Sequence, residues 1–216
     1  MSGRVEIVEL RLGIQIFFQD EYPLLPHQVT HLATAIATCE AFFGRALNGD
    51  AVREAAATVR SPGRLEVASL NPTVFIDGAH NEEGLRGLAA ALEEELEEEK
   101  WTLVIGMRGE RDVAHLLAAL DGKIGRVVAT EADDHLAIPV AQIAAAAEQA
   151  LGVEVQSVKP VSAALEVALA ETPADEGVVV AGSLYVVGEA RHALGLDNAP
   201  SPVHRRFEPS LETGYE

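Results

Sequence analysis

A chain of 216 residues is long enough to bury one good hydrophobic core, or one core and an appended piece. Its 34 acidic and 16 basic residues give a formal charge of −18, which argues against a surface that binds nucleic acid or anionic membranes. No apolar run reaches the roughly 18 residues needed to span a bilayer, and the N-terminus lacks a signal-peptide pattern. We therefore expect a cytoplasmic monomer that binds neither nucleic acid nor membrane.

The single cysteine, Cys39, excludes an internal disulfide and any metal site built from several cysteines. It lies in the apolar stretch from Leu32 to Phe43, so we expect it to be a small buried hydrophobe. A catalytic thiol would need a nearby base, and the sequence identifies none.

The first 60 residues predict a small appended piece rather than a full domain. Residues 3–19 alternate apolar and polar side chains in places, which suggests a strand or hairpin. Apolar residues then recur at helical spacing from His27 to Leu47, and a second short helix is expected from Asp50 to Val59, with Asn48-Gly49 as the turn between the two.

Beyond a boundary at Ser61-Pro62-Gly63, apolar strands alternate with helical stretches. This alternation predicts a three-layer α/β domain over residues 61–196, with a mostly parallel, Rossmann-like sheet. The expected strands are 64–68, 73–76, 101–106, 126–130, 153–158 and 177–181, and the expected helices are 84–100, 113–120, 140–151, 162–170 and 187–194. Residues 197–216 have no periodicity and predict a disordered tail.

The stretch Asp77-Gly78-Ala79-His80-Asn81 follows the strand 73–76 and precedes a helical pattern. Ligands of parallel α/β sheets sit at such carboxyl ends, where side chains and free helical N–H groups converge. Asp77 could accept a hydrogen bond from a ribose hydroxyl, and His80 could donate a hydrogen bond or carry a proton near pH 7. The alternative for Asp77 is that it only caps the turn.

Two other loops follow predicted strands, Met107 to Asp112 and Gly182-Ser183, and the three loops can share one rim of a sheet. Ser183 can donate to a carboxylate, or it can serve only as a helix cap. Arg64 lies beside a glycine turn, where its guanidinium fork fits phosphate oxygens unless it merely pairs with one of the many carboxylates. The acidic run from Glu93 to Glu99 is typical of a solvated helix face, because nothing forces its carboxylates to converge on a metal.

Three motifs occur in a specific order and spacing: residues 61–67 (SPGRLEV), 77–81 (DGAHN) and 182–188 (GSLYVVG). Together they resemble the C-terminal part of the folylpolyglutamate synthase and dihydrofolate synthase family, which are Mur-ligase-like, ATP-dependent amide ligases. The resemblance covers Leu25 to Leu194. It implies the Mur ligase C-terminal fold for residues 61–196, and it implies that residues 1–60 are the end of the family's central ATPase domain.

The resemblance also implies roles for individual residues. Arg64 and Asp77 would contact the nucleotide, and His80 and Ser183 would serve catalysis or glutamate positioning. Residues 27–31 (HQVTH) resemble the family's HQxxN helix entry, where the asparagine contacts the nucleotide. His31 stands in its place and can stack on or hydrogen-bond a purine, but it cannot copy the paired donor and acceptor of an amide. Arg111-Asp112 keeps the charges of the family's Lys-Asp pair.

The sequence contains no GxxxxGK[ST] phosphate loop, since Gly122-Lys123 is followed by Ile124. The family uses ATP and Mg²⁺, so we expect the phosphate loop and the metal ligands to come from an N-terminal ATPase domain outside this chain, and we assign no metal ligand here. We expect the glutamate-side part of a ligase that joins glutamate to a folate or dihydropteroate carboxylate through an acyl phosphate, inactive alone, as a fragment or a natural truncation. The alternatives are a non-catalytic module that binds an amino acid or nucleotide, a partner of a separate ATPase chain, or a degenerate gene product. Dihydrofolate synthesis and polyglutamylation are not distinguished.

Overall fold

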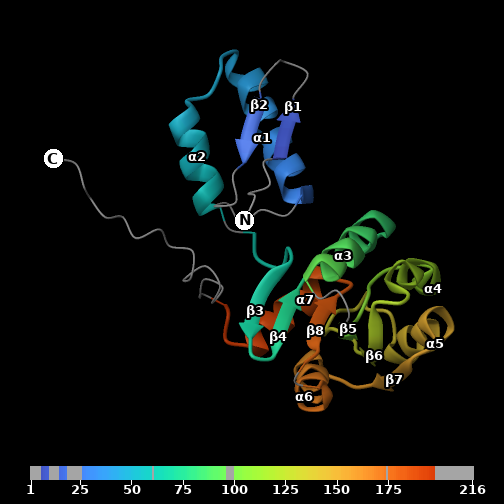
Figure 1. Cartoon of the computed structure of the whole chain (residues 1–216). Coiled ribbons are helices and arrows are strands. Elements are labelled where there is room, and N and C mark those ends of the chain that lie inside the picture. The colour runs from blue at the N-terminus through green and yellow to red at the C-terminus, as the bar shows by residue number, and fades with distance from the viewer. Residues whose placement is uncertain are drawn as a thin grey trace. The chain divides into compact units, whose positions relative to one another are not determined.

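A computed structural model describes residues 6–9, 15–18, 26–59, 61–95, 100–173 and 175–197. The chain forms two compact units, Met1–Arg60 and Ser61–Glu216, drawn in Figure 1. The identification of the first unit with the end of an ATPase domain stays a prediction. Of the predicted disordered tail, all but Asp197 lies outside the described residues.

The first unit contains β1 (Glu6–Glu9), β2 (Gln15–Phe18), α1 (Pro26–Phe43) and α2 (Gly49–Thr58). β1 and β2 pair antiparallel, so of the two predicted alternatives, a strand or a hairpin, the structure shows two paired strands. α2 begins at Gly49 because Asn48 is its N-cap, with Oδ1 accepting from the N–H groups of Asp50 and Ala51. Asn48 and Gly49 therefore start α2, whereas the sequence predicted that they form the turn before it.

Over residues 31–43, the helix α1 buries only a narrow stripe of its surface. Ala33 and Ile36 are buried, and Ala37 is half-buried. Cys39 is exposed, so the prediction of a buried cysteine was wrong. At 3.6 residues per turn, position 39 lies to one side of a stripe through positions 33, 36 and 37, and the described residues of the unit do not cover it.

The second unit holds one six-stranded sheet and its helices (Figure 1). Its elements are β3 (Glu66–Leu70), β4 (Thr73–Ile76), α3 (Glu82–Glu95), β5 (Trp101–Ile105), α4 (Val113–Leu117), a 3₁₀ turn (Ala118–Leu120), β6 (Ile124–Ala129), α5 (Val140–Leu151), β7 (Glu154–Ser157), α6 (Val161–Glu171), β8 (Gly177–Ala181) and α7 (Leu184–Ala193). The strand order is β3-β4-β8-β5-β6-β7, and only the β3–β4 pair is antiparallel. The predicted three-layer α/β class with a mostly parallel sheet is thus confirmed.

Some element bounds differ from the prediction because backbone geometry and caps decide them. β3 begins at Glu66 rather than at Arg64, since Leu65 has a φ of 45°, outside the extended region. α7 begins at Leu184 rather than at Val187, because the hydroxyl of Ser183 caps it.

The acidic helix α3 begins at Glu82, directly after the DGAHN loop, where the sequence pattern becomes helical, and two residues before the expected range 84–100. The side chain of Asn81 explains this start, since its Oδ1 accepts from the N–H of Gly84 at 2.8 Å. The described helix ends at Glu95, and residues 96–99 of the acidic run lie outside the described residues. Glu93 is exposed, as a solvated face requires.

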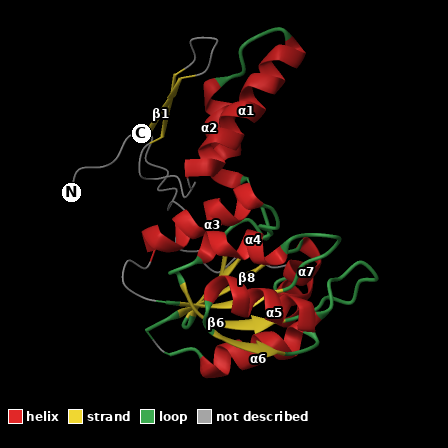
Figure 2. Cartoon of the chain, turned by 90° about the vertical axis from the view of Figure 1, so that its right-hand side faces the viewer, coloured by secondary structure: helices red, strands yellow, loops and turns green. Residues whose placement is uncertain are grey.

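Successive residues of each strand face opposite sides of the sheet, and helices cover both sides, as Figure 2 shows. Val74, Val104 and Val180 belong to one core cluster together with Val161 of α6 and Val186 of α7. The residues between them on each strand point the other way, toward the side of α3, α4 and α5. No helix among the described residues is long and apolar enough to cross a bilayer.

This topology creates a switch point at the carboxyl edge of the sheet. β8 lies between β4 and β5, but its following helix α7 covers one face, whereas α3 and α4, which follow β4 and β5, cover the other. Loops after neighbouring strands therefore leave in opposite directions. Parallel α/β sheets bind their ligands at such a point.

Candidate active site

The loops after β4, β8 and β5 meet at this edge. The N–H of Gly182 donates to the carbonyl oxygen of Ala79 at 2.8 Å, which joins the loops after β8 and β4. The Nη1 of Arg111 donates to the carbonyl oxygen of His80 at 2.6 Å, which joins the loop after β5. The expected shared rim is thus present, and it brings His80 and Ser183 onto connected loops.

Asp77 uses both carboxylate oxygens to hold the backbone. Its Oδ2 accepts from the N–H of Leu65 at 2.7 Å, and its Oδ1 accepts from the N–H of Ala79 at 2.6 Å. The first bond fixes a residue with positive φ, and the second closes the turn of the DGAHN loop. The structural role considered for Asp77 is therefore real, and contact with a ribose stays a prediction.

Arg64 reaches over the same loop. A Cβ on Gly78 would lie 2.8 Å from Nη1 of Arg64 and 2.6 Å from Cδ2 of Leu184, so only glycine leaves room for this approach. The N–H of Gly78 also donates to the carbonyl oxygen of Gly63 at 2.7 Å. The predicted phosphate ligand is exposed and sits at the rim formed by the three loops.

A buried ion pair anchors the turn that carries Arg64. The Oε2 of Glu66 accepts from the N–H of Gly63 at 2.9 Å, and its carboxylate pairs with Arg191 of α7. The side chains of Glu66 and Arg191 are 8% and 13% exposed. Arg191 also donates to the carbonyl oxygen of Leu196 at 2.6 Å, so the pair is further satisfied by backbone.

The ring of His80 has a defined tautomer. Its Nδ1 lies 2.7 Å from the carbonyl oxygen of Gly78, and since a carbonyl can only accept, Nδ1 carries the proton in the neutral ring. The Nε2 then presents a lone pair, and no hydrogen bond among the described residues uses it. The geometry suits a side chain that accepts a proton from a bound ligand.

Ser183 is 4% exposed, and its Oγ accepts from the N–H of Tyr185 at 3.0 Å. Capping of α7, the structural alternative raised by the sequence, is therefore what the structure shows. The hydroxyl proton can still be donated to a ligand, so the proposed role in glutamate positioning stays a prediction.

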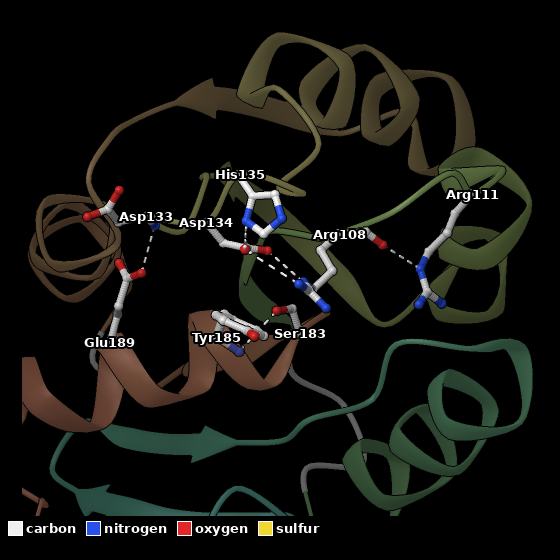
Figure 3. Close-up of polar contacts among 8 residues, drawn as sticks. All are labelled: Arg108, Arg111, Asp133, Asp134, His135, Ser183, Tyr185 and Glu189. Carbon is white, nitrogen blue, oxygen red and sulfur yellow. Dashed lines mark hydrogen bonds and ion pairs between the residues drawn. The ribbon is translucent and has the colours of Figure 1, made fainter.

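A cluster in the same region was not predicted from the sequence (Figure 3). The Nε of Arg108 donates to Oδ2 of Asp134 at 2.5 Å, and its Nη2 donates to Oδ1 at 3.4 Å. Its guanidinium carbon lies 4.4 Å from the ring centroid of Tyr185. The hydrogen bond from Arg108 lowers the pKa of Asp134, and Asp134 in turn raises the pKa of Arg108.

Arg108 and Tyr185 belong to stretches that the sequence pattern already distinguishes, but Asp134 follows a different strand, β6. No local pattern links it to the other two, so only the tertiary structure reveals the cluster. Arg111 and Asp112 serve separate contacts. The Nε of Arg111 donates to the carbonyl oxygen of Arg108 at 2.7 Å, and Asp112 caps α4 through the N–H of His115 at 3.0 Å.

His31 lies on α1 of the first unit with an exposed side chain, and its contact with adenine stays a prediction. Across the described parts of the chain, no three His, Cys, Asp or Glu side chains gather into a metal site. The described residues thus provide no ligand set for Mg²⁺, and the phosphate contact of Arg64 stays a prediction.

Residues 63–184 match the family described as Mur ligase, glutamate ligase domain. The chain belongs to this family. The matched region includes Arg64, Asp77, His80 and Ser183, so the loops that meet at the carboxyl edge lie inside the ligase domain.

Comparison with curated proteins relates this Mur ligase domain to the folate branch. A dihydrofolate synthase/folylpolyglutamate synthase of Mycobacterium tuberculosis is 37% identical over 79% of this chain and 39% of its own length. A probable bifunctional folylpolyglutamate synthase/dihydropteroate synthase of Haloferax volcanii is 33% identical over 77% of this chain and 20% of its own. The chain is thus homologous to part of these proteins and spans less than half of their length.

Solved structures confirm the Mur ligase fold. The folylpolyglutamate synthase of M. tuberculosis complexed with ADP and AMPPCP matches 89% of this chain and 47% of its own at a TM-score of 0.75 and 36% identity. A bifunctional folylpolyglutamate synthase/dihydrofolate synthase of Yersinia pestis with Mn, AMPPNP and L-glutamate bound matches 81% of this chain and 41% of its own, at a TM-score of 0.68 and 25% identity.

Proposed function

We propose that this chain supplies the glutamate-side half of an ATP-dependent ligase that joins glutamate to a folate or dihydropteroate carboxylate. The observation that carries the proposal is the meeting of three strand-end loops inside a glutamate ligase domain, where no hydrogen bond among the described residues uses the Nε2 lone pair of His80. The Y. pestis relative with AMPPNP and L-glutamate bound supports this choice of ligands.

In such a reaction ATP supplies the phosphoryl group that activates the substrate carboxylate as an acyl phosphate. Amide formation then needs the ammonium group of glutamate to lose protons as its nitrogen attacks, with phosphate as the leaving group. In this proposal His80 accepts one of these protons at Nε2, and the guanidinium of Arg64 holds phosphate oxygens. The Mg²⁺ ligands and the phosphate loop would belong to an ATPase domain, because the described residues offer none.

The experiment supplies that domain. An intact N-terminal ATPase domain of a related ligase, fused ahead of Met1 or added in trans, should restore glutamate ligation with ATP and Mg²⁺. The isolated chain should release no phosphate from ATP. Testing dihydropteroate and tetrahydrofolate side by side would separate dihydrofolate synthesis from polyglutamylation.

Variants assign the roles in the restored enzyme. Arg64→Ala should lower the rate about 30-fold to a thousandfold, because it removes a contact to developing phosphate charge. His80→Ala should lower kcat, and His31→Asn, which restores the family residue, should leave activity equal or raise it. Ligation indifferent to Arg64 and His80 would refute the assigned roles and favour a binding module whose loops are structural.

A further inference from the structure

The side chain of Arg108 makes more contacts than are needed to join the two loops beside it. The loops after β5 and β6 are already joined by main-chain bonds, from the N–H of Gly109 to the carbonyl oxygen of Leu136 at 2.8 Å and from the N–H of Ile138 to that of Met107 at 2.8 Å. The side chain of Arg108 is not required to join them. Its fixed position therefore calls for another explanation.

The fixed guanidinium keeps one edge unused. Asp134, whose side chain is 5% exposed, occupies Nε and one hydrogen of Nη2, and the ring of Tyr185 covers one face. Nη1 and the second hydrogen of Nη2 have no acceptor among the described residues, and the Arg108 side chain is 32% exposed. Two N–H groups of this kind, side by side on a planar fork, match the two oxygens of a carboxylate.

Asp134 contacts a second side chain as well as Arg108. Its Oδ1 also lies 3.2 Å from Nδ1 of His135. Figure 3 shows Ser183 beside Tyr185, with Arg108 and Asp134 on the adjoining loops. A ligand at the open edge of Arg108 would therefore lie next to the loop that carries the Ser183 hydroxyl.

We propose that Arg108, fixed by Asp134 and Tyr185, binds a carboxylate of the incoming glutamate. The proposal rests on the function proposed above and names a recognition residue for its amino-acid substrate. Phosphate is also an anion whose oxygens accept hydrogen bonds from a guanidinium group, so the test compares both anions.

The binding test uses the full chain, labelled with ¹⁵N, and titrates L-glutamate up to about 50 mM while amide shifts are recorded. Saturable shifts are expected at Arg108, Ser183 and Tyr185, and Arg108→Gln should weaken binding about tenfold or more, because it removes a charge-assisted contact. Arg126→Gln is the matched control: Arg126 is also largely covered, with 27% of its side chain exposed, and pairs with Glu171, but it lies near the start of β6, at the other edge of the sheet. This variant should bind L-glutamate like the unaltered chain.

Several outcomes would overturn the proposal: no saturable shift with L-glutamate, equal weakening in Arg108→Gln and Arg126→Gln, or equal affinity for inorganic phosphate at matched ionic strength. Arg108→Lys, which keeps the charge but loses the fork, should bind with intermediate affinity, and it provides a second variant if Arg108→Gln does not fold.

In the restored ligase, Arg108→Gln should raise the KM for glutamate about tenfold or more and change kcat less. An unchanged KM would overturn the role of Arg108 while leaving the proposed ligase function intact. If the chain binds glutamate through Arg108 but never supports ligation, the glutamate site would be retained and the proposed ligase function would be refuted.

Discussion

Two glycines of the GSLYVVG motif, Gly182 and Gly188, are expected to respond in opposite ways to replacement by alanine. Gly182 has a φ of 103°, and a Cβ there would lie 2.6 Å from both the carbonyl oxygen of Gly106 and Cδ1 of Ile105. The strained backbone costs about 1–3 kcal/mol and the overlap about 1–3 kcal/mol more, so Gly182→Ala should destabilise the fold by about 2–6 kcal/mol. A Cβ added to Gly188, within α7, would meet no heavy atom within 4 Å, so Gly188→Ala should stabilise by about 0.5–1 kcal/mol.

Urea unfolding followed by circular dichroism measures both changes. With a slope of about 2 kcal/mol per molar urea, Gly182→Ala should lower the midpoint by about 1 M or more, and Gly188→Ala should raise it slightly. Hydrogen exchange should also become faster at Gly182, whose N–H holds the Ala79 carbonyl in the native loop. A loss below about 1 kcal/mol in Gly182→Ala would refute the reasoning, because the rim would then relax without strain.

Three further changes test the contacts behind the rim. Arg191→Met leaves Glu66 buried without its partner and should cost about 3–5 kcal/mol in urea unfolding; a loss within error of zero would contradict the buried pair. Asp77→Asn should cost about 1.5–3 kcal/mol, since an amide can replace only one of two acceptors and turns an NH₂ toward the other N–H; unchanged stability would exclude the double contact. Arg108 lowers the folded-state pKa of Asp134, so the ionised carboxylate stabilises the fold above the unfolded pKa of about 4, and this stabilisation is lost as the pH falls through the folded pKa. The free energy of unfolding of Asp134→Asn should therefore fall less steeply with decreasing pH than that of the unaltered chain. Equal pH dependence in the two proteins would argue against the shift.

The Asp77 contacts also change an expectation drawn from the sequence. On the sequence alone, asparagine is a mild replacement, because it could keep part of a ribose hydrogen bond and should cost less than Arg64→Ala. The structure shows that the carboxylate of Asp77 holds the N–H groups of Leu65 and Ala79. Loss of activity in Asp77→Asn must therefore be compared with its loss of stability before it is assigned to nucleotide binding.

The fold could be predicted because its signal is local. Runs such as Val178 to Ala181 are apolar and short, and they alternate with helical stretches, which defines a parallel α/β sheet before any contact is known. The prediction failed where a single side chain or dihedral decides, as at Ser183, whose cap starts α7, and at Leu65, whose positive φ delays β3. The predicted burial of Cys39 was wrong for another reason, since an apolar stretch does not reveal which side of a helix packs against other elements.

The sequence predicted only those candidate site residues that directly follow a strand. Asp77, His80 and Ser183 follow predicted strands, so their loops were placed at the carboxyl edge by topology alone. Asp134 also follows a strand, but an aspartate in a polar loop has no distinguishing pattern. Its pairing with Arg108 joins residues 26 positions apart in sequence, and the stacking on Tyr185 depends on the sheet order that brings β8 beside β5.

The net charge of −18 is a poor guide to what an anion meets at this edge. Arg86 pairs with Glu82 at the start of α3, Lys159 pairs with Glu131 beyond the ends of β6 and β7, and Lys123 pairs with Glu93. Arg111 instead has only main-chain carbonyls as partners among the described residues, so no carboxylate directly offsets its charge. Because salt screens exposed charges beyond about 8 Å at physiological ionic strength, distant acidic residues such as Glu93 have little effect on the charge of Arg111. An acidic chain can therefore still offer a single cationic contact, such as Arg111, to glutamate or phosphate at the switch point of the sheet.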